Sequence, residues 1–115
     1  MVAQLKKLKT KYVDNNIPCY IGEMGNVNRG EDRAEAFRGY YFEYLCKACK
    51  DFGLAPIIWD NGSSNVGKEA SGMIDHGTGA IIREKYNKGH LETMVNAIEN
   101  DDESYTLESV YDKAP

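Results

Sequence analysis

Apolar residues recur at helical spacing in three stretches of the chain, which predicts three amphipathic helices. The first covers residues 2–12, carries lysines on its other faces and ends at residues 14–16, Asp-Asn-Asn. The second begins at residue 31 or 32 and continues for about five turns to Gly53, the residue type that most often terminates a helix. The third covers residues 90–100.

Two apolar runs of strand length, Ile17–Gly22 and Leu54–Asp60, alternate with these helices. Pro18 is compatible with a strand because the first residues of a strand need not donate to the ladder. Neither run alternates apolar and polar positions, so we expect both strands to be buried on two faces, as in a parallel α/β sheet. Two strands alone would leave open edges, and we therefore expect the chain to be part of a larger fold or half of an assembly.

The polar segments complete this outline. Asn26–Asp32 is a short polar loop, whereas Gly62–Gly79 is glycine-rich and longer than most connections in compact domains, which indicates a functional loop. We expect residues 1–100 to form the ordered portion and residues 101–115 an acidic, mobile tail.

The composition fits one soluble domain and excludes some functions. The chain has 115 residues, of which 42% are hydrophobic and 28% charged, and its net charge of -4 argues against nucleic-acid binding. No apolar run approaches the roughly 20 residues that a membrane-spanning helix needs. Residues 1–10 are too polar for a signal peptide. His76 and His90 lie in polar surroundings, and we expect both at the surface.

Three cysteines do not form a disulfide framework. Cys46 and Cys49 have the C-x-x-C spacing of a redox pair or half of a zinc site, but no second pair of ligands follows and the stretch is predicted to be helical. We therefore expect both to be buried structural residues, and we expect no metal and no cofactor.

The candidate chemistry lies where the two predicted strands end. Glu23 stands between Gly22 and Gly25 after the first apolar run, and Trp59 closes the second. In a parallel α/β fold the ligand binds at the carboxyl ends of the strands. A carboxylate beside an indole suits a sugar, whose apolar face stacks on the aromatic ring while the carboxylate acts at the anomeric carbon. The residues alone leave other roles open: Glu23 could face water or cap a helix, and Trp59 could belong to the core.

Residues 62–68 also match the G-x-x-x-x-G-K pattern of a phosphate-binding loop. The next residue is Glu69, where a hydroxyl should bind magnesium, and its carboxylate would repel phosphates. Ser71-Gly72 interrupts the helix that should follow. Nucleotide binding therefore remains a minor alternative.

Several motifs together resemble glycoside hydrolase family 5 endoglucanases. Residues 21–25, Ile-Gly-Glu-Met-Gly, resemble the motif that ends the seventh strand of their barrel, and residues 57–62, Ile-Ile-Trp-Asp-Asn-Gly, resemble the one that ends the eighth. The aromatic-rich helix at 37–50 lies between them, and 67–69 and 72–75 resemble the following loop. The resemblance covers roughly residues 3–98 and about a quarter of a (β/α)8 TIM barrel. The chain is thus expected to be its last part, α/β strands 7 and 8 with their helices.

This resemblance implies a role for each candidate residue. Glu23 would be the nucleophile of a retaining mechanism, Trp59 the platform under the sugar at the cleavage point, and Asn61, Lys68 and Glu69 would bind sugar hydroxyls. The expected substrate is a β-1,4-glucan. Enzymes of this family are commonly exported, so the resemblance also implies an extracellular parent enzyme.

The chain also departs from the family pattern. Met24 and Ile58 stand where many relatives have aromatic residues. Retaining chemistry needs a second carboxyl about 5 to 5.5 Å from the nucleophile. The family takes it from an Asn-Glu pair, and this sequence contains no such pair. We therefore expect the isolated chain to be inactive. The alternative is a small self-associating α/β binding module without catalysis.

Overall fold

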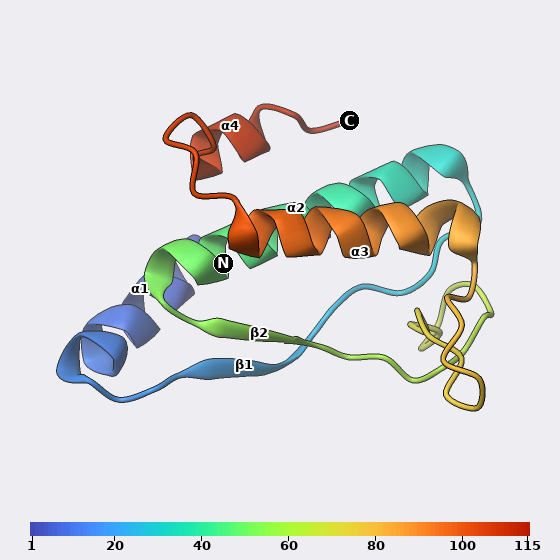
Figure 1. Cartoon of the computed structure of the whole chain (residues 1–115), viewed down its shortest axis with the longest axis horizontal. Helices are drawn as coiled ribbons and strands as arrows, with labels where there is room; N and C mark the ends of the chain where they lie inside the picture. Colours follow the sequence, from blue (N-terminus) through green and yellow to red (C-terminus); the bar gives the residue numbers. More distant parts are fainter.

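The computed structural model describes residues 1–115. Its elements are α1 (Val2–Lys11), a 3-10 turn (Val13–Asn15), β1 (Tyr20–Met24), α2 (Asp32–Phe52), β2 (Ala55–Ile58), α3 (Glu84–Glu99) and α4 (Leu107–Tyr111). The strands form a parallel pair, and α2 and α3 lie side by side over one face of it (Figure 1). The predicted alternation of helices and strands is confirmed. None of the helices has the length and apolar character needed to cross a membrane.

The two strands bring residues 34 or 35 positions apart in sequence into register. Tyr20 pairs with Ala55 and Met24 with Ile58, with an irregularity between Ile21 and Met24. The backbone N–H of Trp59 donates to the carbonyl of Met24 at 2.8 Å, one residue beyond β2. The ends of the two strands are therefore held together where the candidate chemistry lies.

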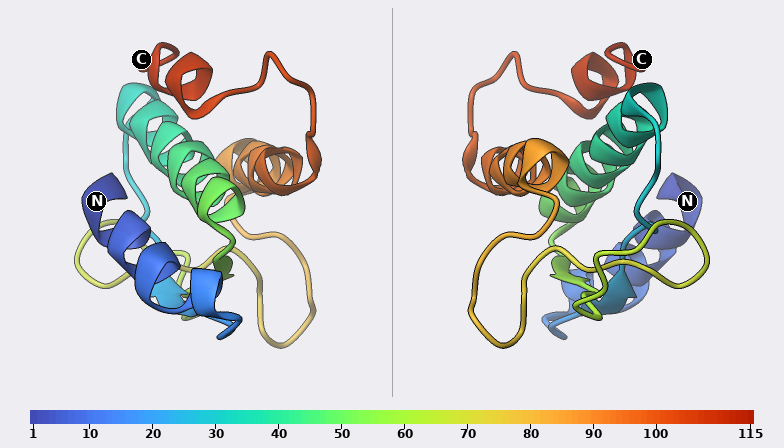
Figure 2. Two further views of the ribbon diagram at one scale, coloured as in Figure 1. Left: turned by 90° about the vertical axis from the view of Figure 1, so that its left-hand side faces the viewer. Right: turned by 90° about the vertical axis from the view of Figure 1, so that its right-hand side faces the viewer.

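The expectation that both faces of the strands are buried is wrong for this chain. Tyr20 is 65% exposed and Ile57 46% exposed. The helices cover only one face of the sheet, and nothing in this chain covers the other (Figure 2). A continuous apolar run indicates that both faces are suited to burial, but the covering partner must also be present.

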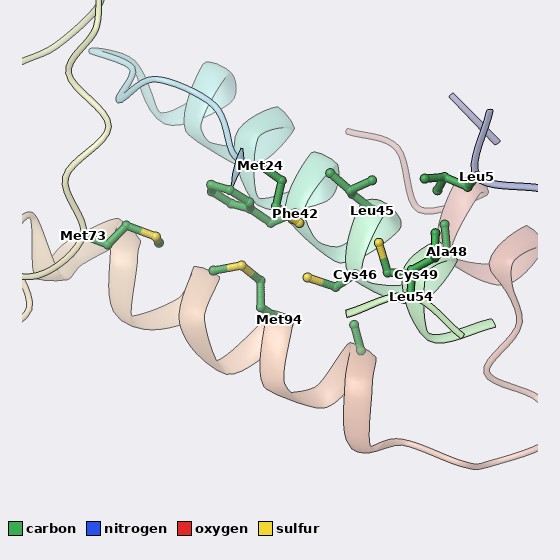
Figure 3. Close-up of a cluster of buried hydrophobic side chains, with 11 residues drawn as sticks. Leu5, Met24, Phe42, Leu45, Cys46, Ala48, Cys49, Leu54, Met73 and Met94 are labelled. Carbon is green, nitrogen blue, oxygen red and sulfur yellow. The ribbon is translucent and has the colours of Figure 1, made fainter. Parts of the chain in front are cut away.

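The hydrophobic core lies between α2, α3 and the covered face of the sheet. Five of its 11 buried residues come from α2, more than from any other element, and Met94 of α3 faces them (Figure 3). Cys46 and Cys49 are 2% and 0% exposed and unpaired, which confirms their predicted structural role. Burial raises their pKa values to about 12 and about 11. Helix α2 ends at Gly53 as predicted, with a left-handed φ of 72°.

A buried carboxylate joins α2, α3 and both loops above the sheet. Glu35, at the start of α2, is 1% exposed. Its Oε1 accepts hydrogen bonds from the Arg29 backbone N–H at 2.6 Å and from Arg83 at 2.8 Å. Its Oε2 accepts one from Arg38 at 3.2 Å and lies 2.8 Å from His90 Nε2. We refer to Glu35, Arg38, Arg83 and His90 as the Glu35 cluster.

Arg38 extends this cluster to the loop after β1. Its Nε donates to the carbonyl of Asn26 at 3.0 Å, and its Nη1 donates to Asn87 Oδ1 at 2.8 Å. The amide of Asn87 in turn donates to the carbonyls of Ile82 at 2.6 Å and Gly72 at 3.3 Å. The loops after β1 and β2 are therefore fixed to the same buried side chains.

The prediction that His90 lies at the surface is wrong, and α3 begins at Glu84 rather than at residue 90. Both differences have one cause. The inward face of the first turns of α3 carries Asn87 and His90, which are polar because they meet the Glu35 cluster rather than the apolar core. Apolar periodicity is absent there, so it could not indicate the start of the helix. His76 is exposed, as predicted.

The segment 101–115 contains structure that its acidic composition did not indicate. Helix α4 lies over α2 on the side away from the sheet (Figure 2). Val110 is fully buried, and the Tyr105 hydroxyl donates to Glu43 at 2.8 Å. A capping box at Thr106 and Ser109 fixes the start of α4. The mobility of this segment stays a prediction.

The stability of the fold should depend on pH through Glu35. Burial by itself raises the pKa of Glu35, but its hydrogen bonds, led by the one from Arg83, lower it from 4.5 to about 2. Because the folded-state pKa is the lower one, ionised Glu35 stabilises the fold above about pH 4.5. That contribution, at most about 3 kcal/mol, is lost as the pH falls towards 2.

Urea unfolding followed by circular dichroism at a series of pH values measures this effect. We expect Glu35→Gln to be less stable than wild type at neutral pH and to lose less stability on acidification. Glu92→Gln, on the exposed face of α3, is the matched control and should follow the wild-type profile. Equal acid sensitivity of Glu35→Gln and wild type would contradict the assignment.

Candidate active site

The carboxyl ends of β1 and β2 open into one cavity of about 520 Å³. Its walls come from the end of β1, the residue after β2 and the two following loops. They comprise Glu23, Met24, Gly25, Asn26, Val27, Trp59, Asn61, Lys68, Glu69 and Ser71. The structure therefore brings every site residue predicted from the sequence to a single cavity. Asn26, Val27 and Ser71 join them and were not singled out by the sequence.

Glu23 and Trp59 are both available to a ligand. Glu23 is exposed, and its carboxylate makes no hydrogen bond or ion pair within the chain. Trp59 is 50% exposed. The backbone N–H of Trp59 donates to the carbonyl of Met24, the residue after Glu23. The indole and the carboxylate therefore come from the ends of adjacent strands. The arrangement offers an acceptor or nucleophile beside an aromatic surface.

Asp60 organises the long loop that follows β2. Its Oδ1 accepts hydrogen bonds from the backbone N–H groups of Gly62 at 2.8 Å and Met73 at 3.2 Å. Its Oδ2 accepts one from Ile74 at 2.9 Å, and His76 Nε2 lies 3.4 Å from Oδ1. Burial alone would raise the pKa of Asp60, but these backbone bonds keep it below its ordinary value. The charged carboxylate thus joins the start of the loop to the backbone at Met73 and Ile74.

Asn61 uses most of its amide to close the same loop. Its Oδ1 accepts from the N–H groups of Ser63 at 3.1 Å and Ser71 at 3.2 Å. Its Nδ2 donates to the carbonyl of Glu69 at 2.5 Å. One Nδ2 hydrogen remains for a ligand. Asn61 lies in the cavity wall, but most of its bonds hold the loop.

Lys68 and Glu69 have the opposite character. Both are exposed, and neither side chain makes a hydrogen bond or ion pair within the chain. Lys68 has a left-handed φ of 46°, which a non-glycine residue adopts only where the surrounding structure imposes it.

Residues 62–68 lack the strand-loop-helix arrangement of a phosphate-binding loop. No helix follows them directly, because α3 begins only at Glu84.

The buried residue Asn28 imposes this loop conformation, and sequence reasoning missed it. Its Nδ2 donates to the carbonyls of Ser63 at 3.0 Å and Asn65 at 2.9 Å. Its backbone carbonyl accepts from Gly67, and its N–H donates to Ala70. An asparagine within a polar loop carries no local pattern that reveals these distant partners.

The sequence analysis named Gly72 as a helix breaker and as part of a loop motif, but it did not indicate the close backbone contact that Gly72 makes. A Cβ atom there would lie 2.4 Å from the backbone N and O of Ser63, so only glycine allows the two strands of the loop to meet. Its carbonyl accepts from Asn87, which connects the loop to the Glu35 cluster.

Comparisons with known proteins agree on one group of relatives. No protein-family profile matches the chain. It is 30% identical over 94 residues to Endoglucanase B of Neocallimastix patriciarum, covering 82% of this chain and 19% of that protein. It is 36% identical over 83 residues to Endoglucanase A of Ruminococcus albus, covering 68% of this chain and 21% of that protein. The chain thus spans about a fifth of the length of each of these two relatives.

Solved structures give the same result. A Bacteroidetes-affiliated GH5 cellulase linked with a polysaccharide utilization locus superposes with a TM-score of 0.94 and 41% identity, over 99% of this chain and 29% of that one. A GH5-4 broad specificity endoglucanase from Bacteroides salanitronis gives a TM-score of 0.79 and 38% identity, over 86% of this chain and 26% of that one.

The role of Asp60 in the loop can be tested by amide hydrogen exchange. In Asp60→Asn one carboxylate oxygen becomes an amide nitrogen that cannot accept a hydrogen bond. A bond to a charged group contributes about 1.5–3 kcal/mol, so we expect the amides of Met73 or Ile74 to exchange about tenfold faster or more. Asp75→Asn, in the same loop, should affect only the local turn at Gly77 and Thr78. Unchanged exchange at Met73 and Ile74 would refute the role of Asp60.

Proposed function

This chain belongs with the glycoside hydrolase family 5 endoglucanases, as the carboxy-terminal part of their (β/α)8 barrel, and we propose that it supplies the nucleophile of a retaining endo-β-1,4-glucanase. Its relatives are named as glucan hydrolases. The observation that carries the proposal is the placement of Glu23 and Trp59 in one cavity at adjacent strand ends.

In the proposed reaction the sugar at the cleavage point stacks on Trp59, and Glu23 attacks its anomeric carbon. The bond to the leaving oxygen breaks, a covalent glycosyl-enzyme forms, and water later hydrolyses it. Glu23 suits this role because a nucleophilic carboxylate must be ionised, and an exposed strand end keeps it hydrated. The proton for the leaving group comes from a second carboxyl that this chain does not supply.

The loop residues would position the sugar. Lys68 can donate to sugar hydroxyls and Glu69 can accept from them, because neither is engaged within the chain. Asn61 would contribute chiefly by holding the loop, with one remaining hydrogen for the substrate. Because Asn28, Asp60 and Asn61 hold the backbone of this loop, the loop loses little conformational entropy when a substrate binds.

The proposed substrate is a β-1,4-glucan, and the proposed location of the parent enzyme is extracellular. The proposed substrate follows from the names of the relatives, which include endoglucanases and a xyloglucan-specific endo-beta-1,4-glucanase. The proposed location rests on the family resemblance alone. Residues 1–100 would form the carboxy-terminal portion of the catalytic barrel, with residues 101–115 attached through α4.

A chimaera tests the nucleophile. We expect a cellulase in which this chain replaces the matching segment of the 41% identical Bacteroidetes enzyme to hydrolyse β-glucan. Glu23→Gln should lower its kcat/KM by at least about 10³-fold, since the covalent step is lost. Glu92→Gln is the control. The chain alone should be inactive, because the acid that assists the leaving group is missing.

Chemical rescue makes this test specific. In the Glu23→Ala variant of the same chimaera, added azide should attack the anomeric carbon from the side that Glu23 occupied. The expected product is the α-glycosyl azide. A β-glycosyl azide, or full activity of Glu23→Gln, would remove Glu23 from the nucleophile position.

The exposed face of the sheet supports a second candidate function, a self-associating binding module. Tyr20 and Ile57 would be covered by a second copy of the chain. Sedimentation equilibrium, which reports the oligomeric state, and a sugar titration together separate the two proposals. For the glucanase we expect sugar binding whose affinity does not depend on protein concentration. A dimer with no sugar affinity would favour the module instead.

A further inference from the structure

The last part of the loop after β2 is a small hairpin, residues 74–81, which is joined to the turn where the loop begins. The residues at its two ends form an antiparallel bridge. The Asp75 carboxylate fixes its tip by accepting two backbone N–H bonds at 2.8 Å. Asp60, the residue after Trp59, accepts the N–H bond of Ile74 at 2.9 Å. The 74–81 hairpin is therefore attached to the backbone that carries Trp59.

His76 makes a second contact between the 74–81 hairpin and this turn. Its Nε2 lies 3.4 Å from Asp60 Oδ1, which is within ion-pair distance. Its ring also lies against Gly62, where a Cβ atom would be 3.2 to 3.3 Å from three ring atoms. Gly62 has a left-handed φ of 72°, so both the backbone and the imidazole favour glycine there. The ring of His76 thus packs on the turn that contains Asn61, a residue of the cavity wall.

Two carboxylates, those of Asp60 and Asp75, are affected by the charge of His76. Burial acts to raise the pKa of Asp60, but its backbone hydrogen bonds lower it below the ordinary value. The pKa of Asp75 is lowered by the N–H bonds from Thr78 and Gly77. Because both carboxylates are ionised above about pH 4, protonation of the imidazole decides whether the ion pair forms.

We propose that His76 is a positioning residue, which holds the 74–81 hairpin to the turn after β2 when its imidazole is protonated and so makes the order of the cavity wall depend on pH. An exposed imidazole is ordinarily protonated below about pH 6.5, and His76 is exposed. Its charged form attracts the Asp60 carboxylate, whereas its neutral form makes a weaker contact. The added stability is therefore present at low pH and is lost as the pH rises and the imidazole loses its proton.

The other histidine of the chain has a different role. His90 is buried, and burial lowers its pKa although the hydrogen bond with Glu35 acts in the opposite direction. It belongs to the Glu35 cluster and makes no hydrogen bond to the loop after β2. Histidine is the side chain that ordinarily changes charge between pH 5.5 and 7.5. A change in the loop over this range is therefore assigned to His76, and substitution of His76 tests the assignment.

The consequence for a ligand rests on the proposed function. Trp59 and Asn61 flank Asp60 in the sequence, and both line the cavity. When the 74–81 hairpin is held to this turn, the cavity wall is more ordered and loses less conformational entropy on binding. A β-glucan oligosaccharide should therefore bind more tightly at pH 5.5 than at pH 7.5.

Amide hydrogen exchange of the 15N-labelled chain tests the effect on the loop. The rates are measured by nuclear magnetic resonance and expressed relative to an unstructured peptide at the same pH. In wild type we expect the Ile74 amide to be about twofold to fivefold better protected at pH 5.5 than at pH 7.5, the effect of one surface ion pair. His76→Gln should give the lower protection at both pH values. His76→Arg, whose charge is permanent, should give the higher protection at both.

Two controls make this test specific. Salt at about 0.5 M should reduce the wild-type difference, because it screens exposed charges. Glu92→Gln, on the exposed face of α3, should keep the wild-type pH dependence. Equal protection of wild type at the two pH values, or an undiminished pH dependence in His76→Gln, would overturn the inference.

Titration with cellotetraose, followed at the Trp59 indole N–H, tests the effect on the cavity. We expect the affinity of wild type to be about twofold to fivefold higher at pH 5.5 than at pH 7.5, and that of His76→Arg to be the same at both. An affinity of wild type that does not change while loop protection does would overturn the role of His76 at the cavity. If cellotetraose binds at neither pH, the proposed function is overturned, and the exchange rates alone decide on His76.

Discussion

The buried carboxylate of Glu35 is the interaction on which the arrangement of this molecule depends. Removing a charge from water costs several kcal/mol, and the cost is offset only when the charge is fully paired and hydrogen-bonded. Glu35 meets this condition through partners on α2, on α3 and in the loops after both strands. If a partner moved away, the buried charge would be left unpaired. The free-energy cost of that state holds each partner in place. The apolar core fixes the helices on the sheet, and this charge fixes the loops on the helices.

The candidate site is built in the same way, because polar side chains hold the backbone of its loop. Polar side chains that are buried or already bonded, chiefly Asn28, Asp60 and Asn61, hold the backbone of the loop after β2. Two of the side chains that line the cavity from that loop, Lys68 and Glu69, have no partner in the protein. Support and ligand contact are thus assigned largely to different residues, and Asn61 contributes to both. Substitution of a supporting residue should therefore resemble loss of binding although the residue touches no sugar.

The sequence predicts those features that local patterns determine. Helix α2 follows from its apolar spacing and Gly53, and Glu23 and Trp59 meet because parallel strands end on one side of a sheet. It fails where a distant partner decides the environment. His90 is buried because Glu35, 55 positions away, requires a donor, and the open face of the sheet is exposed because no partner covers it.

The two cysteines of α2 give this fold a property that concerns neither sugar nor site. Cys46 and Cys49 lie in the core with almost no exposed surface. Since only the thiolate reacts with alkylating reagents, burial shields both residues twice, by excluding the reagent and by disfavouring the charged form. Alkylation therefore requires the packing around α2 to open. The rate at which these thiols are modified thus measures how often the interior of the molecule opens.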